Sequence, residues 1–248
     1  GGLGNQIFQI AYALHLKSLN IKTYVDTHFY SSNMMFPRKL ELNIKDYGLS
    51  IINFKNNTIF DRFNVLFREI ESFSINDLKK FNRFVGYYQD FDILNQFKET
   101  FQNTFDLEKE SYDKNLVAVH IRRGDYLQLD QVLTKKYYNS AYERLLMDKN
   151  NYYFDIFTDE VDIDKIRGYF KNVNNIFQPT KEESPLKTFK KLSMYQNYIL
   201  ANSSFSAIAA FLSRCENKQI FYPSPWWRMS DITISNIPEK WIPIINHK

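Results

Sequence analysis

The sequence has 248 residues and a formal net charge of +4, from 32 Lys and Arg against 28 Asp and Glu. Apolar residues make up 44% of the chain and charged residues 24%, which excludes disordered, collagen-like and coiled-coil proteins. The charge surplus is too small for the basic footprint of a nucleic-acid-binding protein, so no nucleic-acid partner is expected. A single cysteine, Cys215, excludes an intrachain disulfide framework and a multi-thiolate zinc site, and a reducing, cytoplasmic compartment is the expectation.

A Gly-rich turn opens the chain and leads into a helix. Apolar side chains from Ile7 to Leu14 recur at the i, i+3, i+4, i+7 spacing, which predicts a helix over residues 6–19. A strand is expected to precede such a turn. The other elements predicted in the first half are strands at 23–26 and 84–88 and a helix near 93–101, within an otherwise irregular stretch that reaches about residue 110.

In the second half, short apolar strands alternate with amphipathic helices. This order predicts an α/β fold with a parallel, doubly wound sheet, and the apolar strands indicate that helices cover both of its faces. The predicted strands are 116–121, 153–157, 176–177, 198–201 and 220–222, and the predicted helices are 137–147, 161–170, 186–195 and 205–212.

Ligands of such sheets bind beyond the carboxyl ends of the strands, which selects the polar loops after Ile121, Phe157 and Ala201. The first of these loops begins with Arg122 and Arg123, and guanidinium groups bind phosphate oxygens as a bidentate fork. If the strand continues, the two arginines point to opposite sides, so that one faces a ligand and the other braces the loop. The alternative is a surface pair of arginines whose salt-bridge partner is Asp125.

The other selected loops also carry polar groups. Asn202-Ser203-Ser204-Phe205-Ser206 enters a helix, where hydroxyls and free backbone N–H groups form an anion site; an ordinary serine cap is the alternative. Asp159-Glu160 offers acceptors for a guanine or a ribose, or else caps the next helix. Gly1-Gly2-Leu3-Gly4-Asn5-Gln6 places backbone amides at a further helix start.

Two D-x-D patterns, Asp90-Phe91-Asp92 and Asp162-Ile163-Asp164, match the pattern of metal-dependent sugar transferases. Each sits at or near a predicted helix start, where aspartate is favoured as a cap, and no metal site is predicted.

Several segments together resemble one family, the inverting α-1,2-fucosyltransferases of bacterial and animal glycan synthesis (glycosyltransferase family 11). They occur in the family's order across nearly the whole chain. The matching segments are GGLGNQIFQIAYAL at the start, GYYQ at 86–89, HIRRGDY at 120–126, YY at 137–138, FTDE at 157–160, ILANSSFS at 199–206 and IFYPSPWW at 220–227.

The resemblance implies a GT-B type α/β fold with two Rossmann-like lobes, residues 1–112 on the acceptor side and residues 113–248 binding the donor nucleotide. It implies transfer of L-fucose from GDP-fucose to the 2-hydroxyl of a galactose-containing glycan, without a cofactor or an obligatory metal. A lipid-linked acceptor would draw the weakly basic surface to the inner face of a membrane.

The family's donor-phosphate arginine corresponds to Arg122, with His120 and Arg123 beside it, and Arg122 and His120 are the first catalytic candidates. A general base would take the proton of the acceptor; Asp125 is the first candidate for this role and Asp130 the second. The residues expected at the donor site are Arg123, Asp159, Asn202, Ser203, Ser204, Phe205, Ser206, Gly2, Gly4, Asn5 and Gln6.

The chain departs from the family pattern at two places. Ala207 and Ile208 stand where the family usually has two tryptophans, and Glu160 stands where it has a second aspartate. The alternatives are another fucosyltransferase of the HxRR type with a different linkage, a D-x-D metal-dependent glycosyltransferase, a non-catalytic nucleotide- or sugar-binding protein, and a single-stranded RNA binder.

Overall fold

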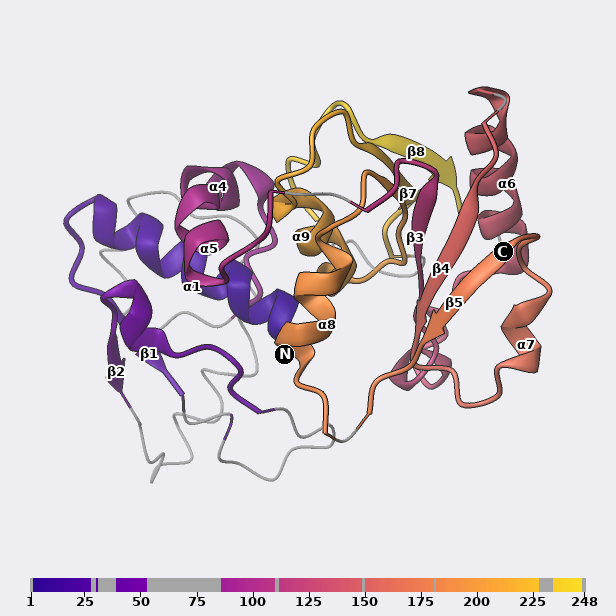
Figure 1. Cartoon of the computed structure of the whole chain (residues 1–248). Coiled ribbons are helices and arrows are strands. Elements are labelled where there is room, and N and C mark those ends of the chain that lie inside the picture. The colour runs from indigo at the N-terminus through magenta and orange to yellow at the C-terminus, as the bar shows by residue number, and fades with distance from the viewer. Residues whose placement is uncertain are drawn as a thin grey trace. The chain divides into compact units, whose positions relative to one another are not determined.

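The computed structural model describes residues 2–27, 30, 39–52, 86–109, 112–148, 150–180, 182–227 and 234–246. The chain forms two compact units, Gly1–Lys98 (unit 1) and Glu99–Lys248 (unit 2), which are coloured by residue number in Figure 1. This division precedes the predicted boundary at 112/113, because helix α5 (Lys98–Thr104) packs with unit 2. Phe101 of α5 is fully buried, and the Gln102 amide donates to the Leu212 carbonyl at 2.8 Å.

Unit 1 is built around α1 (Leu3–Ser18), which begins earlier than predicted. Helix α4 (Phe91–Gln96) packs on it through an edge-on contact of Phe8 with Phe91, at 5.5 Å between ring centroids. The predicted strand at 23–26 is confirmed as β1 (Tyr24–Asp26), which pairs in parallel with β2 (Ser50–Ile52); the 3-10 helix η2 (Ile44–Tyr47) precedes β2.

Two predictions for the first half of the chain are wrong in detail. The helix predicted near 93–101 is two short helices, α4 and α5, separated at Phe97. Residues 86–88 of the strand predicted at 84–88 are not a strand, because Tyr88 has a φ of 50°, which turns the backbone; residues 84 and 85 lie outside the described residues.

The sheet of unit 2 confirms the predicted parallel α/β architecture. Its strand order is β5-β4-β3-β6-β7-β8, and every pair is parallel. In chain order this is 3-2-1-4-5-6, the order of doubly wound nucleotide-binding folds. The strands are β3 (Leu116–Ile121), β4 (Tyr153–Thr158), β5 (Val173–Phe177), β6 (Asn197–Ile199), β7 (Gln219–Ser224) and β8 (Ile242–Ile245).

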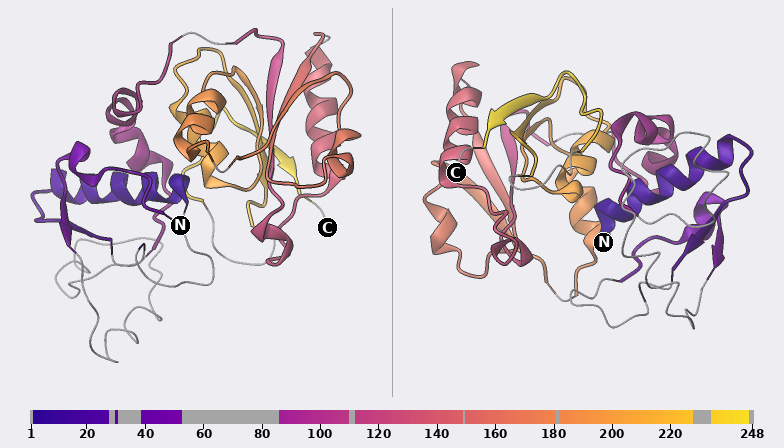
Figure 2. Two further views of the ribbon diagram at one scale, coloured as in Figure 1. Left: turned by 60° about the horizontal axis from the view of Figure 1, so that its bottom comes forward. Right: turned by 180° about the vertical axis from the view of Figure 1, so that it is seen from behind.

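Helices cover both faces of this sheet, as the left view of Figure 2 shows: α6 and α7 lie on one face, and α8 and α9 on the other. Buried side chains of β3 and β4, among them Val117 and Ile156, pack against Tyr138 of α6. The helices are α6 (Lys135–Leu145), α7 (Asp164–Arg167), α8 (Pro185–Leu192) and α9 (Ser204–Leu212), with 3-10 turns η3 (Asp125–Leu127) and η4 (Leu146–Asp148). None of the helices in the described ranges has both the length and the apolar composition that crossing a membrane requires.

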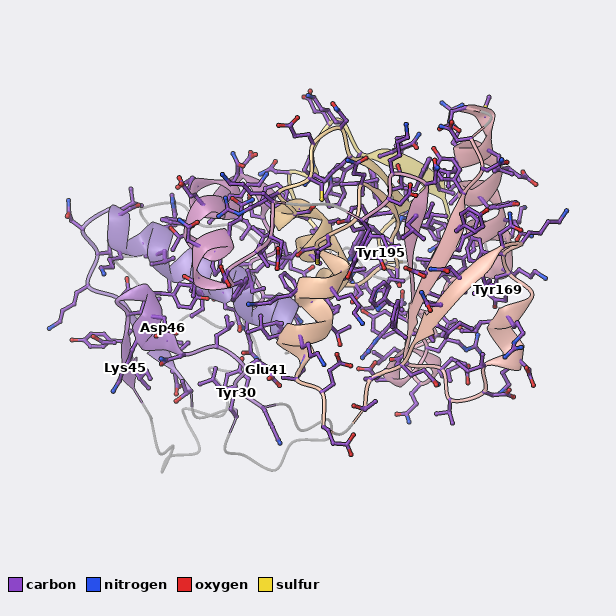
Figure 3. All side chains as sticks on the ribbon, viewed as in Figure 1. Tyr30, Glu41, Lys45, Asp46, Tyr169 and Tyr195 are labelled. Atoms are coloured by element: carbon purple, nitrogen blue, oxygen red, sulfur yellow. The ribbon has the colours of Figure 1, made fainter. Side chains whose placement is uncertain are left out.

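A buried carboxylate lies inside unit 2. Asp155 of β4 is 3% exposed and accepts hydrogen bonds from the Asn174 and Asn175 amides, at 2.9 and 3.0 Å. The Tyr195 hydroxyl, labelled in Figure 3, donates to its second oxygen at 2.7 Å. These three donors replace the water that the carboxylate loses on burial, which fixes β4, β5 and the connection between α8 and β6 together.

Candidate active site

Three polar loops meet at the carboxyl edge of the unit 2 sheet. The strand order reverses between β3 and β6, and ligands of doubly wound sheets bind at such a reversal. The loop after β3 carries Arg122, and the loop after β6 carries Ser203. The loop after β4, the neighbour of β3, carries Asp159. The sheet therefore brings together the three loops that the sequence analysis selected.

Arg122 is held between two carboxylates. Its Nη2 lies 2.6 Å from Oδ1 of Asp125, and its Nη1 lies 2.7 Å from Oδ2 of Asp159. The guanidinium carbon also lies 5.4 Å from the centre of the Tyr126 ring, within the range of a cation–π interaction. Since 24% of its side chain is exposed, Arg122 is a fixed cation that a ligand at the sheet edge can reach.

Asp159 shapes the backbone of the arginine loop. Its Oδ1 accepts the N–H groups of Arg123 and Gly124, at 2.6 and 3.2 Å, while its Oδ2 pairs with Arg122. A Cβ on residue 124 would lie 2.5 Å from Oδ2 of Asp159, so this close approach requires glycine. In this structure the Asp159 carboxylate is bound to the protein's own arginine loop.

Arg123 forms an ion pair with Glu160, through Nε and Oε2. The pKa of Glu160 lies below its usual range, chiefly because the carboxylate accepts the Asp162 N–H, and also because of the Arg123 charge. The strand register explains both arginine pairs. Ile121 lies opposite Thr158, so the residues that follow the two strands, Arg122 with Asp159 and Arg123 with Glu160, lie close together. This pairing was not predicted, although the sequence carries a signal for it: two arginines follow one strand and two acidic residues follow the next.

His120 lies at the buried end of β3 and is 7% exposed. Burial, and then the charge of Arg122, lower its pKa from 6.5 to about 3, so the imidazole is neutral in neutral solution. The Tyr138 hydroxyl donates to its backbone carbonyl at 3.1 Å, and its Nδ1 has no hydrogen-bond partner among the described residues. A neutral, buried ring suits the support of Arg122 better than proton transfer.

The serine loop leads into α9. Ser203 is the N-cap residue and is 8% exposed, and its side chain makes no capping hydrogen bond to the helix. Ser206 is fully buried and bonds back to the Ser203 carbonyl at 3.3 Å, whereas Ser204 and Phe205 are partly exposed. Asn202 is 1% exposed, and its amide donates to the Gln131 carbonyl at 2.9 Å.

The two residues at which the chain departs from the family pattern lie in the interior. Ala207 and Ile208 of α9 are both 0% exposed. They pack in the core of unit 2 and therefore line no open surface in this structure.

Tyr126 connects the arginine loop to the serine loop, a contact that the sequence analysis did not single out. Its hydroxyl donates to the backbone carbonyl of Asn202 at 3.0 Å, and its ring lies 5.6 Å from that of Trp227. Burial raises the pKa of Tyr126 to about 12.

The two candidate bases differ in their surroundings. Asp125 begins the turn η3 and is bound to Arg122, with 19% of its side chain exposed. Asp130 is exposed and has a φ of 51°, at the end of the same loop.

The N-terminal candidates lie in unit 1. Gly2 precedes α1, and Gly4, Asn5 and Gln6 lie in its first turn. The Gln6 amide is buried and bonds to backbone atoms on both sides: it donates to the Lys39 carbonyl at 2.8 Å and accepts the Glu41 N–H at 2.9 Å. Asn5 accepts from the Gln89 amide at 2.8 Å, so α1 holds the GYYQ segment.

Both D-x-D pairs make local contacts at helix starts. Oδ1 of Asp90 accepts the N–H groups of Asp92 and Ile93, at 2.8 and 3.1 Å, and so caps α4. Asp162 and Asp164 pair with Lys165 and Arg167 at the surface, at 3.5 and 3.7 Å. In the part of the chain that the structure describes, no three His, Cys, Asp or Glu side chains are placed to share a metal ion.

Known proteins resemble this chain along most of its length. It is 29% identical to an alpha-1,2-colitosyltransferase of Escherichia coli, over 98% of this chain and 96% of that protein. It is 25% identical to the O-antigen biosynthesis glycosyltransferase WbnK of Escherichia coli, over 92% of this chain and 93% of that protein. No solved structure matches the chain significantly.

The model of one protein family, described as Glycosyl transferase family 11, matches residues 1–231. That range includes the arginine loop, the Asp159 loop and the serine loop, which meet at one edge of the parallel sheet. The chain therefore belongs to glycosyltransferase family 11, whose members use a nucleotide-sugar donor and a glycan acceptor.

Proposed function

We propose that this glycosyltransferase moves L-fucose from GDP-fucose to the 2-hydroxyl of a galactose-containing glycan, with inversion and without a metal ion or other cofactor. The observation that carries the proposal is Arg122, a solvent-accessible guanidinium fixed by Asp125 and Asp159 at the reversal of strand order. The family assignment and the α-1,2 linkage in the name of the colitosyltransferase support it.

In the proposed reaction the acceptor oxygen attacks the anomeric carbon as the bond from that carbon to the diphosphate oxygen breaks. GDP leaves with both bonding electrons, and the proton of the acceptor hydroxyl passes to a base. Asp125 is the first candidate for that base and Asp130 the second. Arg122 and the Ser203 end of α9 would stabilise the negative charge that develops on the diphosphate, a contribution of about 3–4 kcal/mol for one such donor.

Unit 2 is proposed as the donor lobe of a GT-B type enzyme, and unit 1 as its acceptor side. Arg123 and Asp159 would then serve the donor indirectly, because each is engaged by the neighbouring loop. Asn202, Ser203, Ser204, Phe205 and Ser206 would contact the donor or shape its loop. Gly2, Gly4, Asn5 and Gln6, at the start of α1 in unit 1, remain predicted donor-site residues. A lipid-linked acceptor would bring the chain to the inner face of a membrane.

Colitose is a second candidate for the transferred sugar, because a relative that covers almost the whole chain is named for it. Colitose is the 3-deoxy counterpart of fucose, so a site that hydrogen-bonds the 3-hydroxyl would discriminate strongly between the two donors.

The test is release of GDP from GDP-fucose with a β-galactoside acceptor, with and without EDTA, and a parallel reaction with GDP-colitose. Release from GDP-fucose that survives EDTA is the expected result. Loss of GDP release in EDTA would indicate a metal-dependent glycosyltransferase that uses one of the D-x-D pairs. Faster release from GDP-colitose would reassign the donor, and GDP binding without turnover on a panel of galactosides would indicate a binding protein.

A further inference from the structure

Tyr126 makes contacts in three directions at the candidate active site. Its ring lies 5.4 Å from the Arg122 guanidinium carbon and 5.6 Å from the centre of the Trp227 ring. Its hydroxyl donates to the Asn202 backbone carbonyl at 3.0 Å. One side chain from the β3 loop therefore contacts both the cation of its own loop and the backbone of the serine loop.

We propose that Tyr126 is a positioning residue, which sets the spacing between Arg122 and the Ser203 end of α9 so that both bind one diphosphate. This inference rests on the proposed function and adds a residue to it. Tyr126 touches neither the donor nor the acceptor in this proposal and acts through Arg122 and Asn202.

The spacing matters because the two diphosphate-binding groups come from different strands. Arg122 follows β3 and Ser203 follows β6, so contacts between the loops help to keep them aligned beyond the sheet edge. A second bond, from the Asn202 amide to the Gln131 carbonyl, joins the loops at 2.9 Å, but it lies at the far end of the arginine loop. The Tyr126 bond, in contrast, lies beside Arg122.

The chemistry of Tyr126 suits this role. Burial keeps its pKa near 12, so the phenol stays protonated and donates to the Asn202 carbonyl throughout the neutral range. The ring face also restricts the tilt of the Arg122 guanidinium, whose two terminal nitrogens are already held by Asp125 and Asp159. Preorganised donors of this kind act most strongly on charge that develops in the transition state.

The experiment compares Tyr126→Phe with a matched control, Tyr137→Phe. Tyr137 is fully buried, and its hydroxyl donates to the Leu200 carbonyl at 2.6 Å, two residues before Asn202 in the same segment. Both substitutions delete one hydroxyl-to-carbonyl bond and leave the ring in place. Turnover with GDP-fucose, KM for each substrate and GDP affinity are measured at a temperature at which all three proteins are folded. Tm is measured separately by thermal unfolding.

Tyr126→Phe is expected to lower kcat about tenfold and to weaken GDP binding by a similar factor, with the acceptor KM within about twofold of wild type. Tyr137→Phe is expected to lower Tm at least as much as Tyr126→Phe does, while turnover and GDP affinity stay within about twofold. A general loss of stability would not produce this split.

The proposal is overturned if Tyr126→Phe matches wild type in both kcat and GDP affinity. It is also overturned if Tyr137→Phe lowers kcat and GDP affinity as much as Tyr126→Phe does. If wild type releases no GDP from GDP-fucose, the proposed function fails. GDP titration of the three proteins still tests Tyr126 in that case, since weaker binding by Tyr126→Phe alone supports the positioning role and equal binding overturns it.

Discussion

The charges around Arg122 are close to balanced before any ligand binds. Arg122 and Arg123 face three carboxylates, those of Asp125, Asp159 and Glu160. An arginine that is already paired loses little side-chain entropy when it binds a phosphate, because its rotamer is fixed in advance. Removal of Arg122 would leave Asp125 and Asp159 to repel the diphosphate.

Arg122→Ala is therefore expected to reduce turnover of GDP-fucose by about 10²–10³. Arg122→Lys keeps the charge but loses the fork, and is expected to restore only part of that loss. Steady-state kinetics of both variants would measure this, with Arg167→Ala as control, since that side chain is 70% exposed and pairs only loosely with Asp164 at 3.7 Å. Near-wild-type turnover in Arg122→Ala would contradict the assignment.

His120 predicts a particular pH dependence of stability. Its pKa is about 3 in the folded chain against 6.5 ordinarily, so between these values the unfolded chain holds a proton that the folded chain does not. The free energy of unfolding should therefore fall on acidification from pH 6.5 to 5, by about 1.5 kcal/mol from this residue. His120→Asn removes that contribution, and urea unfolding at the two pH values measures the difference. Equal losses in wild type and variant would show that the ring is protonated in the folded state.

At the scale of elements, α9 begins at the candidate active site, and the side chain of Lys218 binds the carbonyl groups at its other end. The Lys218 ammonium donates to the carbonyls of Ala210 and Ser213, at 2.7 and 2.9 Å, and also approaches the Phe211 carbonyl at 3.4 Å. These carbonyls lie at the C-terminal end of α9, where a cation is favourable. Lys218 thus stabilises the helix whose other end carries Ser203.

Lys218→Met is expected to lower the free energy of unfolding by about 1–2 kcal/mol, because these carbonyls lose a charged donor. Thermal unfolding measures this as a fall in Tm of about 2–4 °C per kcal/mol. Lys187→Met is the control, because that side chain is 74% exposed and its pair with Glu183 spans 3.6 Å. Equal Tm values for the two variants would show that Lys218 does not stabilise α9.

The elements that sequence patterns missed are short or interrupted. Strand β8 contains Pro243, which argues against a central strand, but β8 lies at the edge of the sheet, where a missing N–H is tolerated. Strand β2 has three residues, too few for a periodic pattern. Strand β3, with six residues and five of them buried, has the bounds that its apolar run predicts.

At the scale of the molecule, ligand binding and folding are linked. A nucleotide that binds only the folded unit 2 stabilises it, by about 2.7 kcal/mol when the free concentration is 100 times Kd. GDP at that concentration is expected to raise the Tm of unit 2 by roughly 5–10 °C. Arg122→Ala should lose most of this shift at the same GDP concentration, which differential scanning fluorimetry would show. No shift in wild type would argue against a GDP site in unit 2.

The sequence by itself determined the class of fold and the loops that carry the chemistry. Alternating apolar strands and amphipathic helices predict a parallel sheet, because each periodicity is a local property of a few residues. A parallel sheet in turn places the loops that begin at Arg122 and follow Ala201 at one edge. Specific motifs, such as HIRRGDY and NSSFS, then connected those loops with one enzyme family.

Only the tertiary structure decided which groups meet across the loops. The pairs Arg122–Asp159 and Arg123–Glu160 depend on the register of β3 against β4, and the Tyr126 bond to Asn202 depends on β3 lying beside β6. Such contacts join residues 37 to 76 positions apart, and no local pattern encodes them. The same holds for His120, whose neutrality follows from burial by neighbours that are distant in the chain.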